Sequence, residues 1–236
     1  RHREHRPGQV EARGAPGGLA HLEVLDEQGR HDLHLIQHPG DVTDLPCDDV
    51  PVRSDADRWN ARYADLLPGE PCTPRGLSAL ELPAGGLCLD AACGLGETAV
   101  WAALNGFEVI ALDASEVAVA ATRQFAEDHG VAELVDARVH DLDEGLPGDV
   151  AGECALVVCQ KYRNPELYQA LVDALGDDGV LVVTELSTVG ADTEPGPFHA
   201  PPGALAVAFG ALDVQLVSHH EADGLATLVA RRPDPE

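Results

Sequence analysis

The chain has 236 residues, enough for one α/β domain with a short appendage, and its 15 basic and 41 acidic side chains give a net charge of −26. Nucleic acid is held through its phosphates by Lys and Arg, so an acidic chain whose only lysine is Lys161 is not expected to bind it. No apolar run approaches the ~20 residues of a membrane span, and the basic start lacks the apolar core of a secretory signal, so we expect a cytoplasmic protein. The cysteines show no CxxC spacing, and reduced thiols are therefore expected.

Residues 1–52 are rich in Gly, Pro, His and Asp and are expected to form an appendage of unknown role. Two short apolar segments in it could pair as a small hairpin, and a partly disordered tail is the alternative. Its histidines lie in an irregular context, so no metal site is expected there.

The pattern becomes regular from residue 53 onward. A cap at Ser54 or Asp55 predicts a helix to about Leu67, where a Pro-Gly pair ends it. A proline at position 74 opens a second expected helix, over residues 74–82.

The most informative stretch runs from Leu87 to Gly96, where an apolar run ends in an acid, a glycine-bearing turn and a helix start. This is the layout of a nucleotide pocket in a doubly wound sheet. Gly94 and Gly96 lack a Cβ, so the backbone can turn sharply and a ligand can approach it closely. A dinucleotide site would need G-x-G-x-x-G, and Glu97 would repel a pyrophosphate, so a ligand without phosphate is favoured.

The remaining elements alternate between strands and helices, which implies a parallel sheet. A strand over 107–112 ends at Asp113, placed to accept hydrogen bonds from ribose hydroxyls, and Ser115 can cap a helix to His129. The further elements are strands over 134–139, 154–159 and 180–186, helices over 165–175 and 204–209, and a hairpin of 214–219 with 225–230.

Over about residues 53–236 this pattern resembles the class I S-adenosylmethionine-dependent methyltransferases. Asp90-Ala91-Ala92-Cys93-Gly94-Leu95-Gly96 is similar to their first motif and Val109-Ile110-Ala111-Leu112-Asp113-Ala114-Ser115 to their second. The resemblance implies an α/β fold with a Rossmann-like, doubly wound, mostly parallel sheet of seven strands in the order 3-2-1-4-5-7-6, the last hairpin strand being antiparallel. The family usually has glycine where Ala92 stands, and alanine fits that turn if its φ is negative.

The resemblance also implies S-adenosyl-L-methionine as the cofactor. Asp90 would lie under its amino-acid part, Asp113 would bind the ribose, and Asp141 would accept from the adenine amino group unless it only belongs to a solvated acidic run. The expected cofactor-binding residues are Asp90, Ala92, Cys93, Gly94, Gly96, Asp113, Ala114, Asp141, Leu142, Cys159, Trp59 and Tyr63.

Methyl transfer from a sulfonium requires the methyl group and the acceptor to be held close, aligned and dry, with a base where the acceptor carries a proton. The end of the fourth strand should face both groups, and Lys161, Tyr162 and Arg163 are the expected catalytic residues there. Tyr162 and Arg163 could orient an anionic or planar acceptor. The alternative is that these residues only enter a helix and point into solvent.

The stretch Trp59-Asn60-Ala61-Arg62-Tyr63 is similar to the lid helix of small-molecule methyltransferases of the tellurite-resistance and thiopurine type. Trp59 and Tyr63 are i, i+4 neighbours on one helix face and could close over the cofactor. Amphipathic core contacts are the alternative.

Cys93 and Cys159 follow two strands that should be neighbours, which raises a soft-ligand site for arsenic or selenium species as one hypothesis. Buried, inert thiols are the favoured interpretation. His219-His220-Glu221 is expected to be exposed charge on an edge strand, so no metal is expected there either.

Together these features predict a methyltransferase acting on a small-molecule acceptor through N, O, S or a metalloid, as a monomer or homodimer. A non-catalytic module that binds S-adenosylmethionine or its demethylated product is the main alternative. An NAD or nucleotide-sugar enzyme is disfavoured by the missing third glycine, and a protein or nucleic-acid methyltransferase by the missing basic stripe.

Deleting residues 1–50 is expected to leave a folded domain that binds the cofactor, because every motif lies beyond residue 53. Urea unfolding of the truncated and full chains, side by side, checks this expectation. Loss of the cooperative transition on truncation would show that the appendage belongs to the core.

Overall fold

The computed structural model describes residues 55–77, 82 and 85–233. Contacts divide the chain into Arg1–Val50 and Pro51–Glu236, and all described residues belong to the second unit. The appendage expected over residues 1–52 therefore lies outside the described residues.

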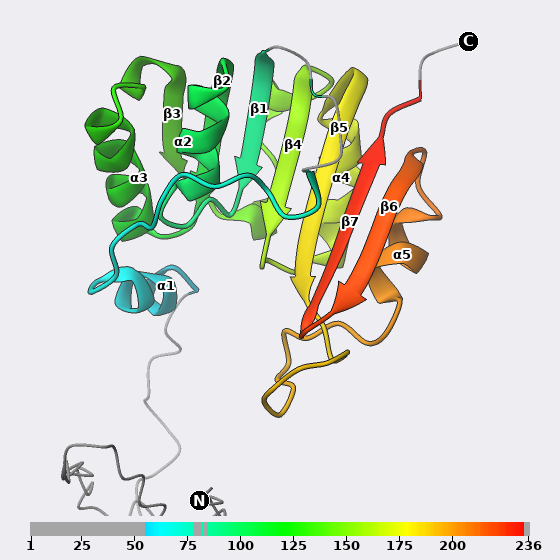
Figure 1. Ribbon diagram of the computed structural model, residues 1–236. Helices are drawn as coiled ribbons and strands as arrows, with labels where there is room; N and C mark the ends of the chain where they lie inside the picture. Colours follow the sequence, from blue (N-terminus) through cyan, green and yellow to red (C-terminus); the bar gives the residue numbers. More distant parts are fainter. Residues whose placement is uncertain (1–54, 78–81, 83–84, 234–236) are drawn as a thin grey trace, which may run out of the picture. The chain divides into compact units, whose positions relative to one another are not determined.

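A seven-stranded sheet with the order β3-β2-β1-β4-β5-β7-β6 forms the centre of this unit (Figure 1). The strands β1 to β5 pair in parallel, and β7 runs antiparallel to both β5 and β6. The strands are β1 Gly86–Ala91, β2 Phe107–Asp113, β3 Val135–Val139, β4 Cys154–Gln160, β5 Leu175–Leu186, β6 Gln215–Ala222 and β7 Leu225–Arg231. The doubly wound, mostly parallel fold with one antiparallel hairpin strand is confirmed.

Five α-helices and several short 3₁₀ turns connect the strands of the described part. The helices are α1 Asp55–Tyr63, α2 Glu97–Leu104, α3 Glu116–Asp128, α4 Tyr168–Asp173 and α5 Ala204–Phe209. The 3₁₀ turns are η2 Ala132–Leu134, η3 Leu142–Glu144, η4 Gly148–Val150 and η5 Pro165–Leu167. Among the described residues, no helix combines the length and the apolar character needed to cross a membrane.

Two apolar clusters, one on each face of the sheet, form most of the core. Side chains alternate along a strand, so Cys88 of β1 packs in the cluster with α2 and α3, while its neighbour Leu89 packs in the cluster with α4 and α5. In Figure 1 the two helix pairs accordingly lie on opposite faces of the sheet. Burial on both faces explains why β1, β2, β4 and β5 are near-continuous apolar runs.

Three sequence predictions of element boundaries were wrong. The first helix ends at Tyr63 in a turn, rather than at Leu67, because both leucines that follow are exposed and offer no apolar face to bury. The helix expected to reach residue 175 ends at Asp173, and β5 already begins at Leu175, which pairs with Cys154 in the core. The second expected helix forms a turn over residues 74–77, and residues 78–81 lie outside the described residues.

The start of α2 packs directly against α3. Gly96 precedes α2 with a φ of 86°, and a Cβ there would lie 2.7 Å from Cγ2 and 2.8 Å from Oγ1 of Thr122. Thr122 is fully buried on α3 and donates a hydrogen bond to the carbonyl oxygen of Gly94 (3.0 Å). Position 96 therefore requires glycine for two reasons: its φ is positive, and a side chain there would collide with Thr122.

Replacing Gly96 with alanine is expected to lower the free energy of unfolding by about 1–2 kcal/mol of backbone strain plus about 1–3 kcal/mol from overpacking against Thr122. Gly130→Ala is the matched control, because Gly130 has a φ of 70° but nothing lies within 4 Å of its Cβ position. Urea unfolding measures the loss of stability in each variant. Equal losses in Gly96→Ala and Gly130→Ala would contradict the predicted collision with Thr122.

Candidate active site

The carboxyl ends of the five parallel strands meet at one edge of the sheet, where ligands bind in doubly wound folds (Figure 1). The turn after β1, the end of β2 and helix α1 form one part of this edge. The ends of β4 and β5 with the loop that follows β5 form the other.

Asp113 at the end of β2 joins the first part together. Its Oδ2 accepts a hydrogen bond from the Gly94 backbone N–H and its Oδ1 from the Ser115 N–H, both at 2.9 Å. The side chain is buried, which raises its pKa, while the two N–H donors oppose that shift. This carboxylate therefore sets the distance between the glycine turn and the start of α3.

Asn60 of α1 takes part in the same network, and sequence reasoning missed its role. The Ser115 hydroxyl donates to Asn60 Oδ1 (2.7 Å) and accepts from the Ala118 N–H, which confirms Ser115 as the helix cap. The Val117 N–H also donates to Asn60 Oδ1 (3.3 Å). An asparagine inside a helix is unfavourable without such a partner, and that was the available signal.

Asp90 in β1 is the most deeply buried carboxylate beside the turn, with 3% of its surface exposed. Its Oδ2 has no hydrogen-bond partner. Burial, and then repulsion from Asp113, raises the pKa of Asp90 to about 7. A buried oxygen without a partner next to a glycine turn suits a ligand that brings a hydrogen-bond donor or a positive charge.

Alanine at position 92 was expected to fit the turn only with a negative φ. This expectation was wrong, because Ala92 has a φ of 61°. The turn must reverse direction between β1 and Gly94 while the Cys93 N–H donates to the carbonyl oxygen of Leu112 (2.9 Å). These contacts hold alanine in a left-handed conformation that costs it about 1–2 kcal/mol. The position where the family usually has glycine thus keeps the glycine geometry.

Trp59 and Tyr63 of α1 stack with ring centroids 5.8 Å apart. Neither ring belongs to the core clusters of the described residues, and both are half-buried. Tyr63 lies over the turn, since a Cβ at Gly94 would be 3.1 Å from its hydroxyl. Burial, followed by the charge of Asp113, raises the pKa of Tyr63, so the hydroxyl stays protonated. The pair covers the edge of the sheet rather than filling the core.

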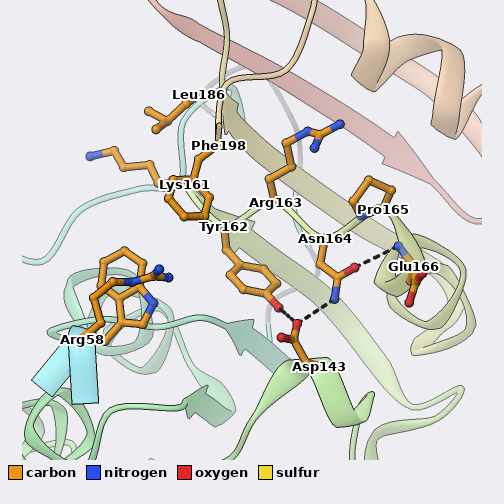
Figure 2. Close-up of a pocket in the computed structure, with 11 residues that line it drawn as sticks. Arg58, Asp143, Lys161, Tyr162, Arg163, Asn164, Pro165, Glu166, Leu186 and Phe198 are labelled. Carbon is orange, nitrogen blue, oxygen red and sulfur yellow. Dashed lines mark hydrogen bonds between the residues drawn. The ribbon is translucent and has the colours of Figure 1, made fainter. Parts of the chain in front are cut away.

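A cavity of about 540 Å³ opens at the second part of the edge (Figure 2). It gathers side chains from α1, from the ends of β4 and β5 and from two loops. Its lining residues are Arg58, Trp59, Asp143, Lys161, Tyr162, Arg163, Asn164, Pro165, Glu166, Leu186 and Phe198. The three residues expected to be catalytic therefore all line the same cavity.

Tyr162 is fixed at the wall of this cavity by Asp143. The Tyr162 hydroxyl and the Asn164 amide each donate to Asp143 Oδ1, both at 3.0 Å (Figure 2). Burial, above all, raises the pKa of Tyr162. Tyr162 is therefore suited to donate a hydrogen bond and not to remove a proton.

Arg163 is held from behind by Glu185, which sequence reasoning missed. Glu185 Oε2 lies 3.5 Å from Arg163 Nε, and its Oε1 accepts a hydrogen bond from the Tyr168 hydroxyl. The Glu185 side chain is fully buried, and burial is the main reason that its pKa is raised. The signal in the sequence was an acid that closely follows the apolar run of residues 180–183.

Lys161 has a φ of 60°, a conformation uncommon for residues other than glycine. Its backbone N–H donates to the carbonyl oxygen of Thr184 at 2.6 Å, which holds the turn at the end of β4. The side chain is exposed at the cavity.

The remaining expected site residues lie around these two parts. Asp141 is exposed and accepts from the Asp143 N–H (3.0 Å), while Leu142 is buried in the cluster with α4. Ala114 is half-buried beside Asp113.

The hypothesis of a paired soft-ligand site is not supported. Cys93 and Cys159 are both buried but belong to clusters on opposite faces of the sheet, and burial raises the pKa of each thiol. Among the described residues no group of three or more His, Cys, Asp or Glu could hold a metal.

The prediction of exposed charge at residues 219–221 was right for both histidines and wrong for the acid. Glu221 is half-buried and accepts from the Ser187 hydroxyl (2.6 Å) and the Gly203 N–H (2.8 Å). It therefore ties down the two ends of the loop after β5.

Comparison with known proteins shows what the fold and part of the chain are similar to. The fold and the strand order define a Rossmann-like, doubly wound α/β protein with a ligand edge at β1 and β2. Residues 88–179 match the family model described as a methyltransferase domain. Residues 88–179 are therefore similar to a methyltransferase domain, in agreement with the resemblance that the motifs indicate. No curated protein sequence matches the chain.

Solved structures share the fold at low sequence identity. The [4+2]-cyclase SpnF has a TM-score of 0.56 and 17% identity, covering 65% of this chain and 77% of that chain. Geranyl diphosphate C-methyltransferase from Streptomyces coelicolor A3(2) has a TM-score of 0.54 and 12% identity, covering 64% of this chain and 75% of that one. TehB from Haemophilus influenzae has a TM-score of 0.51 and 15% identity, covering 63% and 58%.

Asp90→Asn is expected to change how stability depends on pH. Because the pKa of Asp90 is raised from 3.8 to about 7 in the folded protein, folding takes up a proton between these values. The wild-type protein therefore loses stability as pH rises toward and through about 7, whereas the asparagine of the variant cannot titrate. The stability of the variant relative to wild type should rise by about 2–3 kcal/mol from about pH 5 to about pH 8. Urea unfolding at a series of pH values measures this difference, and a constant difference would contradict the buried, unpaired carboxylate.

Proposed function

We propose that this protein transfers a methyl group from S-adenosylmethionine to a small-molecule acceptor bound in the cavity at the end of β4. The observation that carries the proposal is the position of that cavity, at the same sheet edge as the glycine turn of a methyltransferase domain. Its volume of about 540 Å³ falls within the usual range for sites that enclose a small molecule.

The residues around the turn suit the cofactor. Asp90 offers a buried oxygen without a partner, which an ammonium group would satisfy. Asp113 already accepts two backbone hydrogen bonds, but each carboxylate oxygen can accept more than one, so ribose hydroxyls remain compatible with it. Asp141 and the Leu142 amide are proposed for the adenine ring, and the half-buried pair Trp59 and Tyr63 for the cover.

When bound, the cofactor supplies an activated methyl group on a good leaving group. The chain's part is then to align the acceptor and to exclude water. Tyr162 and Arg163 are held in place by Asp143 and Glu185, so the cavity wall is pre-organised before an acceptor enters.

A second candidate is a protein that binds the cofactor without transferring its methyl group. Two observations favour keeping it. One structure with this fold is described as a [4+2]-cyclase, so the fold alone does not set the reaction. In addition, the pKa of Tyr162 is raised, so this side chain is no general base for an acceptor that must lose a proton.

Cofactor binding is tested by calorimetric titration of S-adenosylmethionine and S-adenosylhomocysteine, with NAD as a negative control and at both low and molar salt. Asp113→Ala is expected to weaken binding by about 1–3 kcal/mol, the cost of leaving polar groups unpaired. Asp113→Asn keeps one acceptor for the turn and should lose less, and Glu133→Ala, an exposed acid on η2, is the control. Unchanged affinity in folded Asp113→Ala would remove the ribose assignment.

Methyl transfer itself is tested with isotope-labelled S-adenosylmethionine and a panel of small thiols, amines, carboxylates and metalloids. Label transferred to an acceptor establishes the enzyme. Tight cofactor binding with no transfer to any acceptor would favour the non-catalytic candidate.

A further inference from the structure

The cavity concentrates positive charge in a chain that has little of it. Three of the 15 basic residues, Arg58, Lys161 and Arg163, line this cavity, and Lys161 is the only lysine of the chain. With 41 acidic residues in the chain, the average surface of this protein repels anions. A local group of cations is therefore a departure from the composition of the chain.

Lys161 is an uncompensated cation of this cavity. Its ammonium group forms no hydrogen bond or ion pair within the described part of the chain. The residue is kept in a left-handed conformation, with a φ of 60°, which costs a non-glycine residue about 1–2 kcal/mol. A strained backbone conformation persists only where the surrounding contacts hold the residue in it, and such residues cluster at ligand sites.

Arg163 has donors left over after its contact with Glu185. Its Nε is the atom that lies 3.5 Å from the buried Glu185 carboxylate. The two terminal nitrogens donate no hydrogen bond within the described residues. A guanidinium group has five N–H donors in a planar fork that suits carboxylate and phosphate oxygens. Glu185 and Tyr168 thus fix the side chain without using its full capacity.

Among the described residues, the two acids that line the cavity, Asp143 and Glu166, form no ion pair with Lys161. Asp143 keeps its charge, and its Oδ1 accepts hydrogen bonds from Tyr162 and Asn164. Figure 2 shows Glu166 on the opposite side of the cavity from Lys161 and Arg58. The side of the cavity near Lys161 therefore holds positive charge that a ligand can meet.

Aromatic side chains line the space beside these cations. Arg58 lies 5.5 Å from the ring centroid of Trp59 and 5.2 Å from that of Phe198, so it bridges α1 and the loop after β5. Tyr162 adds a third ring to the lining. Flat rings of this kind favour a planar or apolar ligand body by stacking.

We propose that the methyl acceptor is a small organic anion, with a carboxylate or phosphate group held by Lys161 and a planar body between the aromatic side chains. Arg163 adds positive charge at another wall of the same cavity (Figure 2). The proposal rests on the proposed function, because it names the acceptor class of the same site. Lys161 is then the residue that determines specificity for charge.

The test uses fluorescence of Trp59 in the full chain. The chain has two tryptophans, so Trp101→Phe leaves Trp59, which lines the cavity, as the single reporter. Benzoate and phenyl phosphate are titrated as anionic probes and benzamide as a neutral probe of similar shape, at low salt, with and without saturating S-adenosylhomocysteine. Saturable quenching by at least one anion, with binding at least tenfold tighter than that of benzamide, is expected. Which anion binds more tightly distinguishes a carboxylate from a phosphate group.

Charge variants locate the site of binding. Lys161→Gln is expected to weaken binding of the anion at least tenfold, and Lys161→Arg to restore most of it, while affinity for S-adenosylhomocysteine changes less than twofold. Arg138→Gln removes a positive charge from β3 that is paired with Asp136 and Asp149 away from the cavity, and it should leave the anion affinity unchanged.

Equal binding of benzoate, phenyl phosphate and benzamide, or equal losses in Lys161→Gln and Arg138→Gln, would overturn the proposal. Failure of anion binding with intact binding of S-adenosylhomocysteine would refute the acceptor class alone. Failure to bind S-adenosylhomocysteine in a protein that still selects anions through Lys161 would refute the proposed function and leave the anion site in place.

Discussion

The carboxylate of Asp113 is the constraint on which the ligand edge depends. It accepts the N–H groups of Gly94 and Ser115, and so joins the turn after β1 to the start of α3. Through the Ser115 hydroxyl and Asn60 the same network holds α1 over the edge. Because α1 carries Trp59 and Tyr63, one buried acid connects the glycine turn to the cavity. A ligand that competes for this carboxylate would act on all of these elements together.

The two faces of the sheet contribute differently to the site. On the face covered by α2 and α3 lies Asp90, a carboxyl group buried without a partner for its Oδ2, whose pKa is raised to about 7. On the face covered by α4 and α5 lies Glu185, whose partners are Tyr168 and Arg163. The first acid has no ion pair within the described part of the chain, whereas the second lies 3.5 Å from a cation of the cavity wall. A buried acid thus has a different environment on each face, set by its neighbours.

Basic side chains are few in this acidic chain, so the place of each one affects where an anion can bind. In a protein with a net charge of −26, the single lysine at a cavity stands out from its surroundings more than it would on a mixed surface. Salt screens the repulsion between the acidic surface and an anionic ligand beyond about 10 Å. The attraction between that ligand and Lys161 inside a partly enclosed site is screened less. High ionic strength would thus help an anionic ligand to approach while keeping its direct contacts.

Local patterns in the chain were sufficient to predict a parallel α/β sheet and the glycine turn after its first strand, and the resemblance to a known family implied the strand order. Apolar runs alternate with helix starts along the chain, and Ser115 stands at a position whose hydrogen bond to Asp113 is local in sequence. The hydrogen bond from Gly94 to Asp113 joins the turn after β1 to the end of β2. The left-handed Ala92 and the early start of β5 at Leu175 emerged only from the folded structure. Both depend on contacts with another strand, and no pattern of nearby residues encodes which distant group will meet a given one.

The cavity shows the same division. The sequence placed Lys161, Tyr162 and Arg163 directly after an apolar strand, and in the structure all three lie at the end of β4 and line the cavity. The ion pair of Glu185 with Arg163 joins β5 to the segment after β4 and could not be predicted from either segment alone. The remaining walls come from α1 and from the loop after β5, segments far apart in the chain that meet only because the sheet and its long-range contacts bring them together.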